Sequence, residues 1–315
     1  MVTRMPVRRL GPGLRWGVIV VTAGLCLLAL WASWWEPASL FLREYEIALE
    51  GWPAQAPSMR IAVLADLHTG SPHNDLNKLQ AVVELTNRAE PDMVLLAGDF
   101  VIHGVLGGHF VEPEASAKVL RQLHGPLGVY AVLGNHDWWF DAGRVQRALE
   151  SVGILLLEDR AVRLTNGSAG FWLAGVSDFW EGPHDVAKAL NDVHSAEPVI
   201  LVTHNPDVFP QIPPRVGLTI AGHTHGGQVA VPVVGRPIVP SQFAERYAIG
   251  HIIESGRHLF VSSGIGTSIL PVRFRVPPEV SIVTVRSAQT TSSVTGRLAG
   301  FLNTIRVPSL FAGEV

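Results

Sequence analysis

The side chains of this chain that could do chemistry lie in five short polar clusters. The clusters are Asp66-Leu67-His68, Gly98-Asp99, Gly134-Asn135-His136-Asp137, Thr203-His204-Asn205 and Gly222-His223-Thr224-His225-Gly226-Gly227. They offer carboxylate, imidazole and amide-oxygen donors, which suit divalent Mn, Fe, Zn, Co or Mg better than soft-metal chemistry. The one cysteine, Cys26, lies outside the clusters. The residue types therefore predict a metal centre without thiolate ligands.

The spacing within the clusters indicates two divalent metal ions. Asp66 and His68 are two residues apart, so on an extended segment they point the same way and can clasp one ion. Two cations about 3.5–4 Å apart need a shared anionic ligand, and Asp99 is the candidate bridge. His223 and His225 are also two residues apart, but the glycines after them allow the loop to distort and divide them between the ions.

Each cluster directly follows a short apolar run that predicts a strand. The runs are residues 59–65, 93–97, 129–133, 199–202 and 218–221. Because they are continuous and rich in Val, Ile and Leu, they favour strands buried on both faces. Helical spacing of apolar residues lies between them, over residues 75–89, 114–123 and 142–152. This alternation predicts an α/β sandwich with the clusters gathered at the carboxyl ends of the strands.

The ordered set of clusters resembles the calcineurin-like metallophosphoesterase superfamily, whose pattern runs D-x-H, G-D, G-N-H-D/E, H and G-H-x-H. The chain supplies every block in that order. The resemblance implies a four-layer α/β/β/α sandwich. It also implies a hydrolase that cleaves a phosphodiester, phosphomonoester or pyrophosphate bond through a hydroxide bridging two metal ions, with manganese among the expected ions.

Residue roles come from the same resemblance. It assigns one metal to Asp66, His68, Asp99 and His225, and the other to Asp99, Asn135, His204 and His223. It makes His136 a general acid or a phosphate-orienting group beside the metals. Many relatives carry an acidic residue three positions after Gly-Asp that orients this histidine, but this chain has Ile102 there. Asp137 could take over that task only if the local turn folds it back.

Substrate contacts are predicted at three further residues: His103, Trp138 and Arg273. Aromatic residues at 138–140 and 179–180 could wall a cleft for acyl, nucleobase or sugar groups, or could simply pack over the sheet. His103 lies in a glycine-rich loop and could touch a phosphate or be solvated. Arg273 lies where similar proteins have a Pro-x-Arg-Phe segment, and could hold a phosphate or form a surface salt bridge.

An apolar segment near the amino terminus predicts a membrane anchor. Residues 14–35 are almost wholly apolar apart from Arg15, and at about 1.5 Å per residue they can cross a core of about 30 Å. Arginines precede the segment and glutamates dominate residues 36–50, so the positive-inside rule predicts a single-pass inner-membrane protein with an extracytoplasmic catalytic domain. Arg8-Arg9 faintly resembles a cleaved twin-arginine signal, whereas bulky Trp residues at the candidate cleavage points favour an uncleaved anchor.

The predicted organisation is a basic cytoplasmic N-terminus (1–13), the anchor (14–35), a connector with a strand near 45–49 (36–58), the catalytic domain (59–286) and a flexible tail (287–315). A net charge of −3 and the absence of basic runs in the body argue against nucleic acid as a partner. The expected partner is a phosphate ester, with a lipid-linked one among the candidates. One alternative is a pyrophosphatase similar to those that cleave UDP-2,3-diacylglucosamine in lipid A synthesis. Another is a non-catalytic scaffold with the same fold.

Overall fold

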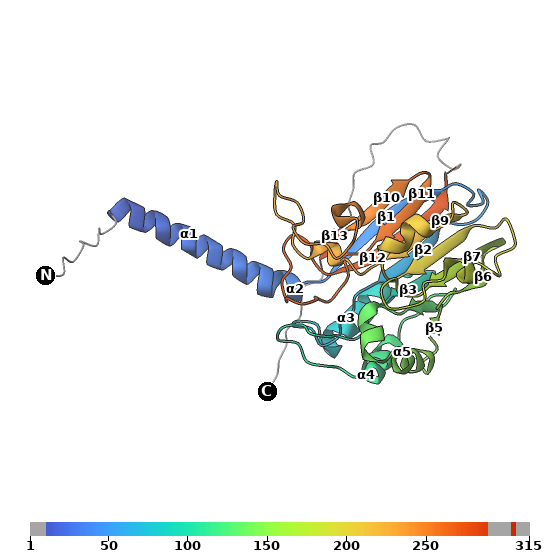
Figure 1. Ribbon diagram of the computed structural model, residues 1–315, viewed down its shortest axis with the longest axis horizontal. Coiled ribbons are helices and arrows are strands. Elements are labelled where there is room, and N and C mark those ends of the chain that lie inside the picture. Colours follow the sequence, from blue (N-terminus) through green and yellow to red (C-terminus); the bar gives the residue numbers. More distant parts are fainter. Residues whose placement is uncertain (1–10, 289–303, 307–315) are drawn as a thin grey trace.

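The computed structural model describes residues 11–288 and 304–306, and builds them around two β-sheets (Figure 1). The first sheet has the strand order β13-β1-β12-β2-β3-β4-β5. Its strands are β1 (Phe41–Leu49), β2 (Met59–Leu64), β3 (Met93–Ala97), β4 (Val129–Val132), β5 (Leu155–Leu156), β12 (Glu279–Ser287) and β13 (Thr304–Arg306). The second sheet has the order β10-β11-β9-β8-β7-β6. Its strands are β6 (Arg160–Asn166), β7 (Ala169–Val176), β8 (Val199–Thr203), β9 (Val216–Ala221), β10 (Gly250–Glu254) and β11 (Arg257–Val261).

Helices cover the outer face of each sheet. The helices on the first sheet are α3 (Leu76–Arg88), α4 (Pro113–Leu120) and α5 (Asn135–Glu150). The shorter α6 (Val186–Ala189), η2 (Pro206–Gln211) and η4 (Ala244–Tyr247) pack on the second sheet. The predicted helices 75–89 and 114–123 correspond to α3 and α4. The third begins earlier than residue 142, because α5 starts at Asn135 within the Gly134 cluster and continues through a kink at Asp141.

The central strands are buried on both faces, as their continuous apolar runs predicted. In β2, Ile61 and Val63 face the second sheet, whereas Ala62 and Leu64 face the helices. In β8, Val202 faces the first sheet. The layer order is therefore helices, sheet, sheet, helices, which confirms the predicted α/β/β/α sandwich.

Within each sheet, the strands that precede the polar clusters run parallel to one another. β2, β3 and β4 pair in parallel in one sheet, and β8 and β9 do so in the other. Parallel strands bring their carboxyl ends to one edge of a sheet. The two sheets thus present five loops to one side of the sandwich.

The ends of the sandwich differ from the predicted boundaries. β1 begins at Phe41 and pairs in parallel with β12 over its whole length, so residues 41–49 belong to the sheet rather than to a connector. Of the predicted tail, residues 304–306 form β13, which pairs antiparallel with β1. Residues 1–10, 289–303 and 307–315 lie outside the described residues.

One long helix extends away from the body (Figure 1). It runs through α1 (Pro12–Leu30), a π-helical turn η1 (Trp31–Trp35) and α2 (Glu36–Ala38). Within the described ranges it is the one helix long and apolar enough to cross a membrane, and no residue of α1 is buried.

The base of this helix is docked on the body by directional contacts. The carbonyl of Ala32 accepts the Arg273 N–H at 2.8 Å, and the Glu36 carboxylate accepts the Val276 N–H at 2.6 Å. The Lys78 ammonium donates to the carbonyls of Ala38 and Ser39, each at 2.7 Å. A cation at a helix C-terminus is favourable there. The helix is therefore fixed to the body rather than tethered.

Arg273 is a structural residue, and its predicted contact with a phosphate is wrong. Its side chain is fully buried, and its guanidinium donates to the carbonyls of Ser263, Gly266 and Val276. The buried guanidinium makes four hydrogen bonds to backbone carbonyls, and Arg273 does not line the pocket, so its side chain faces neither the surface nor the substrate. It instead holds together the loop that receives the base of the long helix.

We expect Arg273→Met to lower the free energy of unfolding by about 3–5 kcal/mol, because buried carbonyls lose their donors. Thermal and denaturant unfolding of the full chain in detergent measures this. Arg275→Met is the matched control, since Arg275 is exposed, and it should change stability by less than about 0.5 kcal/mol. Equal effects of the two substitutions would contradict the assignment.

Candidate metal centre

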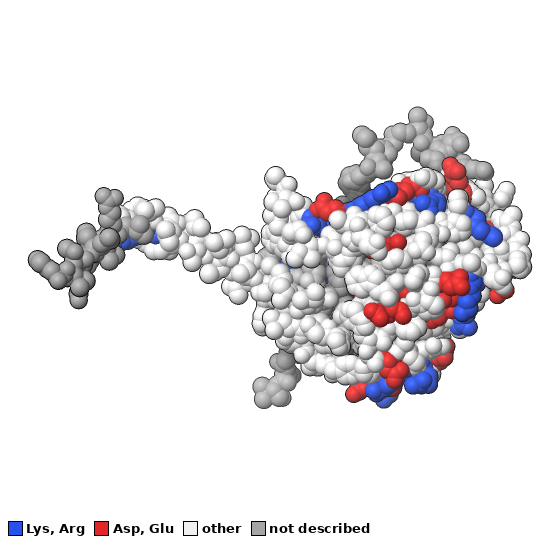
Figure 2. Space-filling view, in the orientation of Figure 1, with Lys and Arg blue, Asp and Glu red and all other residues white. Residues whose placement is uncertain are grey.

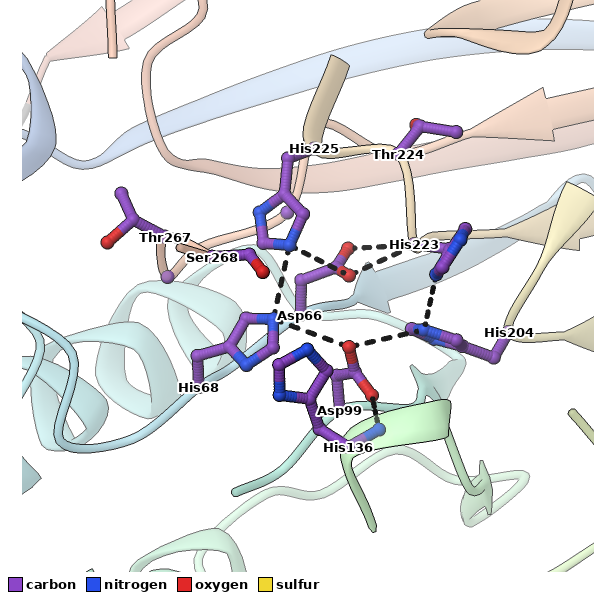
Figure 3. Close-up of polar contacts among 12 residues, drawn as sticks. Asp66, His68, Asp99, His136, His204, His223, Thr224, His225, Thr267 and Ser268 are labelled. Carbon is purple, nitrogen blue, oxygen red and sulfur yellow. Dashed lines mark hydrogen bonds and ion pairs between the residues drawn. The ribbon is translucent and has the colours of Figure 1, made fainter. Parts of the chain in front are cut away.

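The five clusters meet in one buried constellation at the carboxyl ends of the strands (Figure 3). Asp66 and His68 follow β2, Asp99 follows β3, and Asn135 and His136 open α5 after β4. His204 follows β8, and His223 and His225 lie in the loop after β9, where η3 (His225–Gly227) begins. The labelled carboxylates and imidazoles gather around a common centre in Figure 3. Residues up to about 160 positions apart in the sequence are thus brought together.

The first donor group contains Asp66, His68 and His225, whose donor atoms all lie within 4.8 Å of one another. The Nε2 atoms of the two histidines are 3.1 Å apart, and Asp66 Oδ1 lies 3.5 Å from His225 Nε2. His68 Nδ1 lies 3.1 Å from the carbonyl of Val101, to which a protonated Nδ1 donates. That bond fixes the tautomer and leaves the Nε2 lone pair free for a cation.

The second donor group contains Asn135, His204 and His223. His204 Nε2 lies 3.2 Å from both the Asn135 amide oxygen and His223 Nδ1. His204 Nδ1 lies 2.7 Å from the carbonyl of Ala97, the same arrangement that orients His68. Both groups therefore present inward-facing lone pairs of supported imidazole rings.

Asp99 lies between the two groups. Its Oδ2 atom is 3.3 Å from His68 Nε2 and 3.3 Å from His204 Nε2. The other oxygen, Oδ1, accepts the backbone N–H of His136 at 2.9 Å. One carboxylate oxygen thus faces an imidazole nitrogen from each group, so Asp99 links the two groups.

The electrostatics of the cluster suit cations. Burial lowers the pKa of His68 and of His223 to about 3, so both rings are neutral and able to ligate. Burial opposes the charged form of His204, but the Asp99 carboxylate outweighs it and raises the pKa of His204 to about 10. A bound divalent ion competes with that proton. Imidazole nitrogens 3.1–3.2 Å apart, together with buried carboxylates, form a donor set that fits divalent metal ions.

The ligand residues have an unusual backbone. Asp66, His68, Asp99, His223 and His225 all have positive φ, between 38° and 69°. Residues other than glycine rarely adopt this region, and each costs free energy there. The surrounding loops must therefore hold the ligands in place. The packing of these loops is tight at Gly134, where a Cβ would lie only 2.2 Å from Asp99 Oδ1.

Asp137 supports the loop of the bridging residue. Its carboxylate accepts the backbone N–H groups of Asp99, Phe100 and Gly134 at 2.9 Å each, and that of Val101 at 3.2 Å. The turn therefore folds Asp137 back onto the Asp99 loop and not onto the His136 ring.

His136 stands beside both donor groups. Within the described part of the chain its buried Nδ1 has no hydrogen-bond partner, and Ile102, which is also buried, has no polar side-chain atom to offer. The ring packs against His68 and Trp139, with centroids 4.5 and 4.8 Å away. Ring packing, rather than an acidic partner, orients His136.

A pocket of about 230 Å³ opens above the donors. Its walls include His103, His136, Trp139 and Trp180. Among the predicted substrate contacts, His103 therefore lines the pocket. Trp138 does not, because it packs with the helices on the outer face of the first sheet, and its predicted role is corrected accordingly.

Five pocket residues had no signal in the sequence: Gln228, Ile238, Pro240, Ser268 and Ile269. They come from loops that match no motif, and their approach to the donors depends on the packing of those loops. Trp139 and Trp180 belong to the aromatic pairs that could wall a cleft, and only the structure separates them from neighbours that pack inward.

We expect Asp137→Asn to destabilise the protein by about 2–4 kcal/mol and to reduce metal retention, because the new NH₂ group must face two backbone donors. Thermal unfolding and elemental analysis of the purified chain measure both. Asp185→Asn is the control, since Asp185 caps the exposed start of α6 and Asn caps equally well. Retention of full stability and metal by Asp137→Asn would contradict its supporting role.

Comparison with known proteins agrees with this geometry. Residues 59–227 match the calcineurin-like phosphoesterase family. The chain is 28% identical over 261 residues to the uncharacterized metallophosphoesterase YkuE of Bacillus subtilis, covering 82% of this chain and 89% of that protein. It is 30% identical over 252 residues to phosphodiesterase YaeI of Escherichia coli, covering 79% and 89%. It is 27% identical over 291 residues to the transmembrane protein with metallophosphoesterase domain of Danio rerio, covering 86% and 62%. The chain therefore belongs to the calcineurin-like phosphoesterase family and is a metal-dependent phosphoester hydrolase.

Proposed function

We propose that this protein is a membrane-anchored phosphodiesterase with a dinuclear metal centre. The observation that carries the proposal is the Asp99 carboxylate placed between two groups of buried donors, with His136 and a pocket beside them. One ion would be held by Asp66, His68, Asp99 and His225. The other would be held by Asp99, Asn135, His204 and His223.

The ions, when bound, supply Lewis acidity and a water of lowered pKa that serves as nucleophile. The chain supplies only two carboxylates to the pair of ions, so the site keeps a net positive charge of about +2, which attracts a phosphate. Manganese suits this mixture of imidazole, carboxylate and amide ligands.

His136 serves the phosphate. Burial lowers its pKa, although the Asp99 charge partly offsets this, so the ring is neutral near pH 7. A neutral imidazole carries one N–H, which can donate to a phosphoryl or leaving-group oxygen. The ring lines the pocket directly above the donors, where the substrate must lie.

The pocket walls favour an ester with an apolar or flat group. Trp139 and Trp180 offer aromatic faces, while Ile238 and Ile269 add aliphatic surface. A diester has a second substituent that such walls can contact. The relative in Escherichia coli is named a phosphodiesterase, which supports the same choice.

We assign the long helix to the membrane, as a single inner-membrane span with the catalytic body outside the cytoplasm. Its length, its exposure and the relative in Danio rerio named a transmembrane protein support the anchor. Arg15 at its start and Glu36 at its end support the orientation.

A second candidate substrate is a UDP-diacylated sugar, which the aliphatic pocket wall favours. That substrate requires the catalytic body to lie in the cytoplasm. Reporter fusions at the carboxyl terminus distinguish the two positions of the catalytic body. We expect activity from a reporter that works only in the periplasm. Activity from a reporter that works only in the cytoplasm would instead favour the nucleotide sugar as substrate.

We expect Asp99→Ala to abolish both hydrolysis of bis-p-nitrophenyl phosphate in Mn²⁺ and tight metal binding, because it removes the shared anionic ligand. Asp75→Ala is the control: it removes an exposed helix cap, costing about 1 kcal/mol of stability but no activity. Activity that survives Asp99→Ala in a metal-depleted preparation would overturn the proposed function.

We expect His136→Ala to lower kcat by about 10²–10⁴ while metal content stays unchanged, because a proton-transfer group is lost but no ligand. Steady-state kinetics and elemental analysis on one preparation separate these effects. His124→Ala, at an exposed histidine, should leave both values as in the wild type. A loss of metal in His136→Ala would instead make His136 a ligand.

A further inference from the structure

Exposed apolar side chains gather around the mouth of the pocket. Within residues 11–288, the large exposed apolar residues outside the long helix, except for Leu155 and Ile253, lie at the start of α5 beside the pocket or in loops that line the pocket or touch such loops. They are Leu106, Phe110, Trp139, Trp180, Val233, Val234, Ile238, Ile269 and Leu270. Exposed apolar side chains gathered at the mouth of a pocket indicate an interaction site.

The loop 231–240 is the most exposed part of this surface. Val231 and Gly235 close a tight turn by pairing their backbones, and Val233 and Val234 stand at its tip. Their exposed fractions are 108% and 70%. Val233 also has φ of +70°, a conformation costly for a β-branched residue. The tip thus exposes apolar side chains in a backbone conformation that costs free energy. Packing against the body does not offset this free energy, because both side chains are exposed.

The apolar loops are tied to the base of the long helix. The backbone N–H of Arg273 donates to the carbonyl of Ala32 at the helix base. In the same segment, the carbonyl of Leu270 accepts a hydrogen bond from the Gln228 side chain at 3.1 Å. Leu106 N–H donates to the carbonyl of Ile269 at 2.9 Å, which adds the loop 104–110. The helix base and the loops therefore form one connected unit, and the anchor fixes which side of the body faces the bilayer.

The aromatic residues of the helix base lie at this junction. Trp34 packs against His73 of the body, with ring centroids 5.0 Å apart, and Trp31 stacks on Trp35 at 6.0 Å. Tryptophan prefers the level of lipid headgroups. If these residues mark the membrane interface, the neighbouring loops lie at the same level.

Charged residues are scarce in the loops near the pocket and the helix base. The loop segments 103–111, 225–244 and 262–278 contain no Asp or Glu, and their charged residues are Arg236, Arg273 and Arg275. Figure 2 shows a body surface almost without charge beside the long helix, whereas Asp, Glu, Lys and Arg crowd the part farther away. A face with no acidic residue can approach an anionic lipid surface without repulsion.

From these observations we propose that loops 104–110, 231–240 and 268–270 form an apolar collar that enters the outer part of the bilayer and admits a phosphoester carrying an apolar tail. Ile238 and Ile269 belong to the collar and also line the pocket, so a tail can pass from lipid to the site along apolar surface. The proposal rests on the membrane-anchored phosphoesterase function, and it names the surface that the substrate comes from.

The position of the collar is tested by fluorescence on the full chain in vesicles of phosphatidylcholine with some phosphatidylglycerol. A Cys26→Ser background carries either Val233→Cys or Leu155→Cys, labelled with an environment-sensitive nitrobenzoxadiazole probe. Leu155 lies in β5, on the side of the body away from α1 (Figure 1). The probe at 233 should emit as in an apolar medium and be quenched by spin-labelled acyl chains, and the probe at 155 should do neither. Water-like, unquenched emission at both positions would overturn the proposal.

The use of the collar is tested with two esters that share a leaving group: bis-p-nitrophenyl phosphate in solution and hexadecyl p-nitrophenyl phosphate in the vesicles. The double substitution Val233→Asp and Val234→Asp should lower turnover of the hexadecyl ester about tenfold or more and leave the soluble ester unaffected, because neither residue lines the pocket. Leu155→Asp is the control and should affect neither. If the double variant turned over each ester as fast as the wild type does, the collar alone would be refuted. If the wild type were inactive on both esters, the underlying function would be refuted.

Discussion

The carboxylate of Asp99, placed between two sets of imidazole and oxygen donors, is the constraint on which the rest of the site depends. Buried donors of this kind converge only if the backbone that carries them is held rigidly. Five of the seven candidate ligand residues adopt positive φ, and both carboxylate oxygens of Asp137 accept N–H groups around Asp99. The parallel strands behind them provide the rigid frame, since both faces of β2, β3 and β8 are buried.

The fold and the metal donors could be predicted because their signals are local in sequence. An apolar run followed by a polar cluster specifies a strand and the group at its end, and five such units in order leave few arrangements. The family description agrees with that order over residues 59–227. The start of β1 lacked such a local signal: residues 41–44 join the strand by pairing with β12, more than two hundred residues away along the chain.

The errors came from residues whose role depends on distant packing. Arg273 is polar and stands near a family motif, but only the folded loop shows that carbonyls of its own neighbourhood surround it. Trp138 and Trp139 are adjacent in sequence, and the start of α5 sends one to the core and the other to the pocket. Ile238 and Ile269 carry no pattern, because a pocket wall made from loops depends on where those loops meet.

The long helix and the candidate metal centre are parts of one arrangement, since the base of the helix docks on the segment that also borders the pocket. The Asp99 carboxylate is the centre of that arrangement. Electron paramagnetic resonance of the Mn²⁺-loaded protein tests it directly, because two Mn²⁺ ions joined by one carboxylate are magnetically coupled. We expect a coupled dinuclear signal that Asp99→Ala converts to that of isolated Mn²⁺ or removes. A signal of isolated Mn²⁺ in the fully loaded wild type would contradict a shared Asp99.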